Sequence, residues 1–185
     1  MRAFIAIDLD PGIKARLASF ISRAAPLSRG VKWVTQDSMH LTLKFLGEIS
    51  EDQASRLKEG LGTLAARSKP IVLACRGLGS FPPGSPNPRV LWAGVYAGPD
   101  LALLAEAIEN LGQEMGFPRE DRPFHPHLTL GRVKLPGGLR AVLEEFDRAR
   151  EEAFGEMTAR RLTFFQSRLS PSGAEYGVLG EFPFS

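Results

Sequence analysis

The spacing of apolar residues along the 185-residue chain alternates between two patterns, and these patterns predict the secondary structure. Short apolar runs bounded by turn residues indicate strands, whereas apolar residues repeated at helical spacing indicate amphipathic helices. Strands are predicted at residues 2–12, 69–81, 90–100, 157–170 and 175–184. Helices are predicted at residues 13–24, 50–68, 101–116 and 137–155, with Ser50 as the N-cap of the second.

The tetrapeptide His-Leu-Thr-Leu occurs twice, at 40–43 and at 127–130, about half a chain length apart. Each copy is expected to form a further strand, and the order strand, helix, motif strand, helix, strand is the same in both halves. Pro11 and Pro99 occupy matching places near the start of the two halves. An internal repeat explains this shared order better than a plain alternating chain with one coincidental tetrapeptide. We therefore expect residues 1–185 to form a single bilobal domain.

One long loop, residues 81–90, is rich in proline and glycine. It is interpreted either as a connection between the lobes, as a mobile flap, or as a surface loop without a role.

Composition narrows the class of protein but not its activity. The chain is 43% hydrophobic and 24% charged, which is ordinary for a globular protein, and its net charge of +2 does not require a nucleic-acid partner. The single cysteine, Cys75, excludes an intrachain disulfide and a thiolate metal cluster, and a buried place on a strand is expected for it. Asp8 and Asp10 interrupt the first apolar run too early for a signal peptide, and no apolar stretch approaches the ~20 residues of a membrane span. A cytoplasmic location is expected.

The two motifs carry the chemistry. Because alternate residues of a strand share a face, His40 and Thr42 are expected on one face of the first motif, and Leu41 and Leu43 in the core behind it. The second motif repeats this arrangement, and an imidazole and a hydroxyl then lie roughly 6–7 Å apart along each strand.

Two such strands facing one another across a cleft suit displacement at phosphorus. One histidine takes a proton from the attacking oxygen, the other donates a proton to the leaving oxygen, and the threonines hold the remaining oxygens. A single His-x-Thr on a wet strand face usually has no role, but two identical copies at matching places favour catalysis by His40 and His127.

The third histidine, His125, lies two residues before His127 and so shares a strand face with it. This spacing suits a pair of metal ligands. However, Pro126 lies between them, and no Asp, Glu or Cys follows at ligand spacing. His125 is interpreted as a histidine at the edge of the cleft or in the scaffold, and no metal site is expected.

Around these motifs the chain resembles the bacterial and archaeal RNA 2′,3′-cyclic phosphodiesterases, the 2′-5′ RNA ligase-like branch of the two-histidine phosphoesterase superfamily. The blocks that carry the resemblance are "RAFIAIDL", "VKWVTQDSMHLTLKFLGEI", "GLGSFPPGSPNPRVLWAGV", "RPFHPHLTLGRV" and "FQSRLSPSGAEYGVL". The resemblance spans nearly the whole chain. It implies an α+β fold of two pseudo-symmetric lobes, in which mainly antiparallel sheets line a central cleft and the helices lie outside.

The resemblance also implies roles for individual residues. His40 is expected to be the general acid that protonates the leaving 3′ oxygen, and His127 the general base that activates water, although reversal of the reaction exchanges these two roles. Thr42 and Thr129 are expected to bind the phosphate oxygens. The product is a 2′-phosphomonoester, and no metal or other cofactor is implied.

Other residues near the motifs are candidates for the substrate. The resemblance implies that Arg132 binds the phosphate, because the second motif block of the family often carries an arginine after the motif. Strict alternation places Arg132 on the face opposite His127 unless a bulge at Gly131 turns it. Lys44 lies on the His40 face by the same alternation and is the alternative cation. The aromatic candidates for stacking on a base are also typical core residues; they are Trp33, Phe45 and Phe81.

Three functions are therefore weighed. The leading one is hydrolysis of 2′,3′-cyclic phosphates, on RNA ends or small nucleotides, by a monomer that does not bind membranes. The second is the reverse reaction, which joins RNA ends through a 2′-5′ bond. The third is an RNA-end binding module with little turnover, which the small net charge and the intact motifs disfavour.

Overall fold

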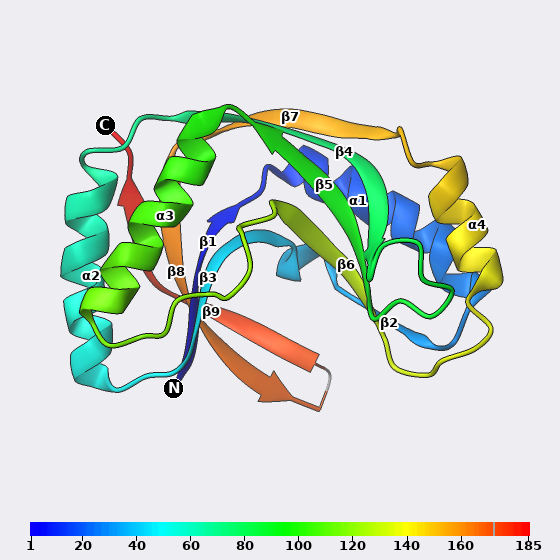
Figure 1. Cartoon of the computed structure of the whole chain (residues 1–185), viewed down its shortest axis with the longest axis horizontal. Helices are drawn as coiled ribbons and strands as arrows, with labels where there is room; N and C mark the ends of the chain where they lie inside the picture. Colours follow the sequence, from blue (N-terminus) through cyan, green and yellow to red (C-terminus); the bar gives the residue numbers. More distant parts are fainter. Residues whose placement is uncertain (172) are drawn as a thin grey trace.

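A computed structural model describes residues 1–171 and 173–185, and its helices and strands are drawn in Figure 1. In chain order they are β1 (Arg2–Asp8), α1 (Pro11–Ala24), β2 (Val31–Trp33), β3 (His40–Glu48), α2 (Glu51–Ala65), β4 (Ile71–Phe81), β5 (Val90–Ala97), α3 (Pro99–Glu114), β6 (His127–Val133), α4 (Arg140–Arg148), β7 (Ala153–Ala159), β8 (Arg161–Ser170) and β9 (Gly173–Pro183). Ser50 caps α2 in a reciprocal capping box with Gln53, as the sequence predicts for this position.

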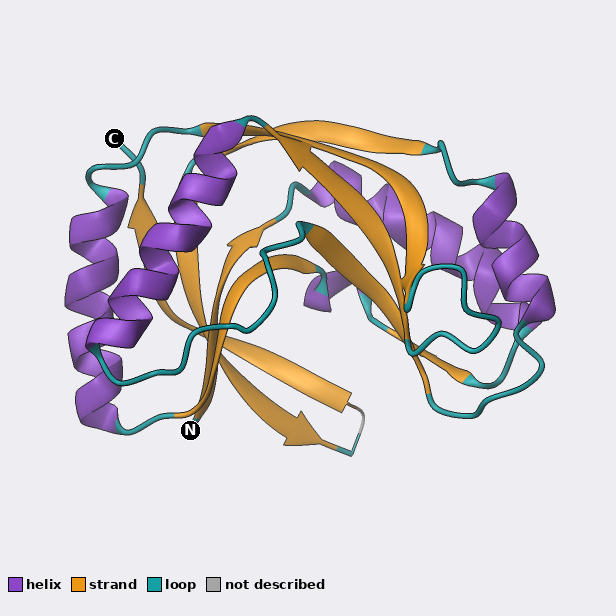
Figure 2. Ribbon diagram, viewed as in Figure 1, coloured by secondary structure: helices purple, strands orange, loops and turns teal. Residues whose placement is uncertain are grey.

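Within these residues the strands form two antiparallel sheets (Figure 2). The first sheet has the order β3-β1-β8-β9, and the second has the order β2-β6-β5-β4-β7. The α+β class, the two lobes and the antiparallel sheets expected from the sequence are confirmed. In addition, the pairing of β1 with β3 in the first sheet has its counterpart in the pairing of β5 with β6 in the second. This correspondence supports the internal repeat, which stays a prediction.

The helices connect the two lobes. α2 and α3 pack on the first sheet, where α3 contacts β3, whereas α1 and α4 pack on the second sheet, where α1 contacts β7 (Figure 1). Strand β1 thus lies in the first sheet while the helix that follows it covers the second, and β5 and α3 show the reverse exchange. Each lobe therefore contains elements from both halves of the chain.

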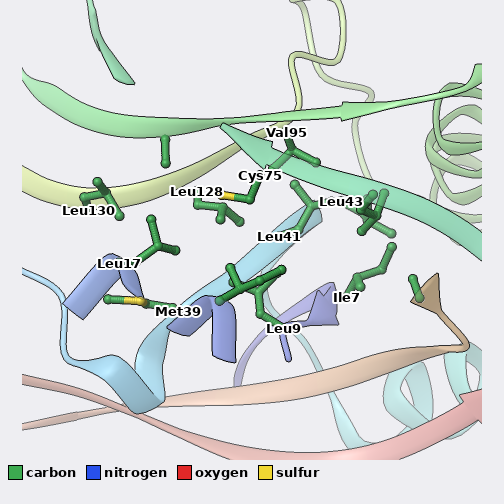
Figure 3. Close-up of a cluster of buried hydrophobic side chains, with 14 of the residues drawn as sticks. Ile7, Leu9, Leu17, Met39, Leu41, Leu43, Cys75, Val95, Leu128 and Leu130 are labelled. Atoms are coloured by element: carbon green, nitrogen blue, oxygen red, sulfur yellow. The ribbon is translucent and has the colours of Figure 1, made fainter. Parts of the chain in front are cut away.

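The leucines of the two motifs lie in one hydrophobic core (Figure 3). Leu41, Leu128 and Leu130 are fully buried and Leu43 is 5% exposed. Leu17 and Cys75 belong to the same core, as the sequence predicts for a cysteine on a buried strand face. Since alternate residues of a strand point to opposite faces, this core directs the histidine and threonine of each motif away from it.

The predicted helix over 137–155 is wrong in its second half. α4 ends at Arg148, and the chain enters β7 at Ala153. Met157 and Ala159 are buried at alternate positions, which is the period of a strand, and Phe154 is buried at a register shift in the ladder with β4. The predicted single strand over 157–170 is accordingly two strands, β7 in the second sheet and β8 in the first.

The loop 81–90 joins β4 to β5, which are neighbours in the second sheet. The amide of Arg89 donates to the carbonyl of Phe81 and closes this hairpin. The interpretation of the loop as a connection between the lobes is therefore wrong.

The three-residue strand β2 is too short for the apolar pattern to have indicated it.

Alternation also gave the wrong face for Lys44. The pairing of β3 with β1 skips Leu43, because Ala6 lies opposite Thr42 and Ile5 opposite Lys44. This bulge turns Lys44 toward α3, where it is 2% exposed. Its ammonium donates at 2.9 Å to both carboxylate oxygens of Glu109 and at 3.0 Å to the carbonyl of Pro118. Lys44 is therefore an internal ion-pair residue and not a cation of the motif face.

No helix in the described ranges is both long enough and apolar enough to cross a lipid bilayer.

The Lys44–Glu109 pair yields a prediction about stability. Glu109→Gln leaves a buried ammonium without its counterion and is expected to lower the free energy of unfolding by about 3 kcal/mol. Urea unfolding measures this change. The matched control is Glu59→Gln on α2, an exposed carboxylate whose removal is expected to have almost no effect. Equal small changes in both variants would show that the buried pair does not contribute as proposed.

Candidate active site

His40 opens β3 and lies within a cluster of aromatic rings. Its imidazole stacks on Phe4 of β1, with ring centroids 4.6 Å apart and planes 27° apart. Tyr176 of β9 meets it edge-on at 5.1 Å, and Phe165 of β8 lies at 5.8 Å. Four residues of the first sheet thus form a platform on the face opposite the leucine core.

Burial among these rings lowers the pKa of His40 to about 4. A backbone hydrogen bond to Ser38 and the nearby carboxylate of Asp8 act in the opposite direction, and Lys14 lowers the pKa slightly further. Asp8 lies directly across the ladder from His40 and is ion-paired with Lys14 at 2.7 Å. His40 is therefore neutral near pH 7 in the free protein.

His127 opens β6 in a corresponding environment. Its ring lies edge-on to Phe81 at 5.2 Å and to Trp92 at 6.5 Å. Its Nδ1 is 2.7 Å from the carbonyl oxygen of His125, so this nitrogen carries the proton and donates it. The other ring nitrogen, Nε2, then has a free lone pair and is fit to accept a proton.

The pKa of His127 is also lowered, mainly by burial. The hydrogen bond to the carbonyl of His125 raises it, whereas the charges of His125 and Arg132 lower it. Both histidines of the motifs are thus held as neutral imidazoles by their surroundings.

Arg132 connects the two clusters. The pairing of β6 with β5 skips Leu130, because Thr129 lies opposite Trp92 and Gly131 opposite Leu91. This is the bulge that Arg132 needs in order to turn toward the face of His127. Its charge influences the pKa of His127 in one lobe and that of Tyr176 in the other. Since Tyr176 contacts His40, the charge of Arg132 reaches the surroundings of both motif histidines.

The threonines of the motifs lie where alternation predicts. Thr42 and Thr129 are partly exposed and lie between leucines that are buried. Two of the three aromatic candidates lie near the motif histidines: the Phe81 ring contacts His127, and Phe45, which is 57% exposed, lies 6.0 Å from Phe4. The third, Trp33, packs at 6.3 Å on Phe146 of α4. Trp33 is therefore a packing residue on the far side of the second sheet.

His125 lies at the edge of the site, as expected. It is exposed, and its ring lies 5.5 Å from Trp92 and 5.4 Å from Phe81. Within residues 1–171 and 173–185, no group of three or more His, Cys, Asp or Glu side chains is arranged to hold a metal ion.

A pocket of about 350 Å³ adjoins His40. It lies between the turn before β3 and the start of β9. Two of its residues also interact with His40, Ser38 through a backbone hydrogen bond and Tyr176 through its ring. A larger hollow of about 710 Å³ is lined by Pro86 and by residues of 137–148 around α4. None of its lining residues is among the ring or hydrogen-bond partners given for His40 or His127, so this hollow is not the candidate site.

Several residues of the site have no signal in the sequence pattern. Tyr176 is distant from both motifs in the chain, and only the pairing of β9 with β8 brings it to His40. Phe4 and Trp92 are ordinary aromatic strand residues until the sheets assemble. In the sequence Asp8 only interrupts an apolar run, yet in the structure it lies opposite His40.

The two motif strands present two neutral imidazoles, two hydroxyls and a guanidinium, which are groups suited to a phosphate ester. The imidazoles can exchange protons, and the hydroxyls and the guanidinium can donate to anionic oxygens. The family model of LigT-like phosphoesterases matches residues 7–92 and 97–176, and the chain belongs to this family.

Two curated relatives are similar over nearly their whole length. A protein of Archaeoglobus fulgidus is 37% identical, with 98% of this chain and 99% of the relative covered. A protein of Thermotoga maritima is 34% identical, with 100% of this chain and 96% of the relative covered. Both are named RNA 2′,3′-cyclic phosphodiesterase.

Solved structures show the same fold. A protein of Thermus thermophilus superposes with a TM-score of 0.85 at 32% identity, covering 100% of this chain and 98% of that one. LigT of Escherichia coli, solved with 3′-AMP, superposes with a TM-score of 0.80 at 24% identity, again over 100% and 98% of the two chains. This second likeness concerns the fold alone.

The depressed pKa of His40 predicts a link between proton uptake and anion binding. An anion at the site stabilises the imidazolium, so the pKa of His40 is expected to rise from about 4 when sulfate binds. By linkage, sulfate affinity is expected to increase as the pH falls from 8 toward 5. NMR titration of the histidine rings with and without sulfate measures both effects.

The control for this titration is His40→Asn, in which the pH dependence of sulfate binding is expected to shrink. A free-protein midpoint near the ordinary histidine value, or a midpoint that sulfate does not move, would contradict the prediction.

Proposed function

We propose that this protein hydrolyses the 2′,3′-cyclic phosphate at RNA ends and leaves a 2′-phosphomonoester. The observation that carries the proposal is the pair of His-x-Thr strands whose histidine clusters are linked through Arg132 and Tyr176. The names of the relatives support the substrate, since they are RNA 2′,3′-cyclic phosphodiesterases at 31–37% identity.

In the proposed reaction His127 is the general base. Its Nε2 takes a proton from water, and the water oxygen attacks phosphorus as the bond from phosphorus to the 3′ oxygen breaks. The bond to the 2′ oxygen remains, which gives the 2′-phosphate. The hydrogen bond from Nδ1 to the carbonyl of His125 holds the ring and stabilises the imidazolium that forms.

His40 is the proposed general acid that protonates the departing 3′ oxygen. A low pKa makes it a strong acid once it is protonated, and the phosphate anion favours that protonation when substrate binds. Thr42, Thr129 and Arg132 are proposed to hold the non-bridging oxygens and to stabilise the charge that develops on them. We further propose that the reaction needs no metal, and that the chain acts as a cytoplasmic monomer formed by one bilobal domain.

Loss of either motif histidine is expected to remove the proton transfer that it performs. His40→Ala and His127→Ala should each lower kcat by about 10²- to 10⁴-fold on an RNA oligonucleotide with a 2′,3′-cyclic phosphate, assayed with a chelator present. His125→Ala is the matched control and should stay within about tenfold of the wild type, because the hydrogen bond that holds His127 goes to the backbone carbonyl of residue 125, which alanine keeps.

The product and the pH profile complete this test. The product end should be a 2′-phosphate, and the profile of kcat/KM should be bell-shaped with its maximum on the acid side of neutrality, because burial lowers both histidine pKa values. Near-normal rates in either motif variant would refute the two-histidine mechanism. Joined RNA ends as the main product would favour the ligase, and binding without turnover would favour the binding module.

Arg132 is expected to act through the phosphate. Arg132→Ala should raise KM and lower kcat, with kcat/KM falling about 10- to 100-fold, because one charge-assisted contact to the phosphate is lost. Steady-state kinetics on the same substrate measure this change. Arg67→Ala, which removes an exposed arginine just after α2, is the control and should leave kcat/KM unchanged. Equal kinetics in the two variants would contradict a phosphate contact by Arg132.

A further inference from the structure

A tyrosine and an arginine lie on the same face of the second sheet as His127, beyond the motif itself. In β5, Leu91, Ala93 and Val95 point into the core, so Trp92, Gly94 and Tyr96 lie on the opposite face. Trp92 contacts the rings of His125 and His127, which identifies this face as that of the active site.

The position of Tyr96 relative to His127 follows from the strand register. Gly94 lies directly opposite His127 in the ladder, and Tyr96 is two residues further along β5, roughly 7 Å away along the strand. A Cβ placed on Gly94 would lie 2.7 Å from the carbonyl oxygen of Arg76, 3.3 Å from the ring of Tyr96 and 3.7 Å from the ring of Trp92. The two rings therefore flank Gly94, and no side chain of β5 separates the motif from Tyr96.

Arg76 of β4 completes this group. Its guanidinium lies over the Tyr96 ring at 4.6 Å from the ring centroid. Tyr96 is 54% exposed, and Arg76 is exposed as well. Among the described residues no carboxylate forms an ion pair with Arg76, and its charge is free for a ligand. Glu156 of β7 pairs with Ala74 in the ladder, so it lies on the same face at the next strand outward.

From this placement we infer that Tyr96 and Arg76 form a binding subsite for the nucleotide adjacent to the cyclic phosphate end of an RNA chain. The inference rests on the proposed function, because it assigns the reacting phosphate to the two motifs. An exposed aromatic ring supplies a stacking surface for any base, and a guanidinium beside it supplies a charge for the linking phosphate and a second stacking plane. Gly94 is itself buried, and the rings of Trp92 and Tyr96 lie on either side of it on this face.

The subsite defines the class of substrate. A mononucleotide 2′,3′-cyclic phosphate fills only the motif site, whereas an oligonucleotide also contacts Tyr96 and Arg76. The protein should therefore prefer RNA chains over single nucleotides. This preference should be tolerant of sequence, because stacking does not read the edges of the bases.

The experiment compares two substrates, cytidine 2′,3′-cyclic phosphate and an RNA trinucleotide that ends in a 2′,3′-cyclic phosphate. The wild type should have the higher kcat/KM on the trinucleotide. Tyr96→Ala and Arg76→Ala should each lower kcat/KM on the trinucleotide about 5- to 150-fold, the range expected for one stacked base, and leave the mononucleotide rate unchanged. Tyr96→Phe keeps the stacking ring and should retain the preference. Arg67→Ala removes an exposed charge outside the site and should change neither rate.

The outcomes separate this subsite from the proposed function. If both substrates are hydrolysed but the variants lose both rates equally, or lose neither, the subsite is refuted while the function stands. If the wild type hydrolyses neither substrate, the proposed function fails. The subsite is then judged by fluorescence binding of a 3′-phosphorylated trinucleotide, which must be weakened by Tyr96→Ala and unaffected by Tyr96→Phe.

Discussion

The burial of four leucines fixes the geometry of the site. Leu41, Leu43, Leu128 and Leu130 anchor the two motif strands in one core that both sheets share, and each buried leucine contributes on the order of 2 kcal/mol relative to exposure. Because the side-chain period of a strand is two, a slip of one residue in either strand would bury the histidine and expose the leucines. Stability and placement of the catalytic groups thus depend on the same contacts.

Bulges then decide what accompanies each histidine. In β3 the bulge after Thr42 turns Lys44 into the interior, where Glu109 neutralises it, and the motif face there is lined by aromatic rings. In β6 the bulge after Thr129 turns Arg132 the other way, toward His127 and Tyr176. The two motifs are identical in sequence, but only the second directs a cation to the face of its histidine. This asymmetry provides a physical basis for different roles of the two histidines.

The surroundings of the histidines also affect how the site responds to a ligand. Aromatic packing holds His40 neutral by desolvation, at a pKa near 4, and so favours a site that takes up a proton together with an anion.

The exchange of helices between the lobes holds the two motif strands in place relative to one another. Since α1 and α3 each cover the sheet that does not contain the preceding strand, the two lobes cannot move far apart without loss of core contacts on both sides.

The sequence by itself determined the order of the four helices and of the strands β1, β3, β4, β5, β6 and β9. It also determined the face of each motif residue from His40 to Leu43 and from His127 to Leu130, and the position at which Arg132 required a bulge. These features follow from local periodicity, which needs no knowledge of partners. The tertiary structure decided the face of Lys44, the end of α4, and the fact that loop 81–90 joins two neighbouring strands of one sheet. It also decided that Tyr176, Phe4 and Asp8 lie beside His40. Each of these depends on which strands pair and in what register, and that choice is made by contacts between residues far apart in the chain.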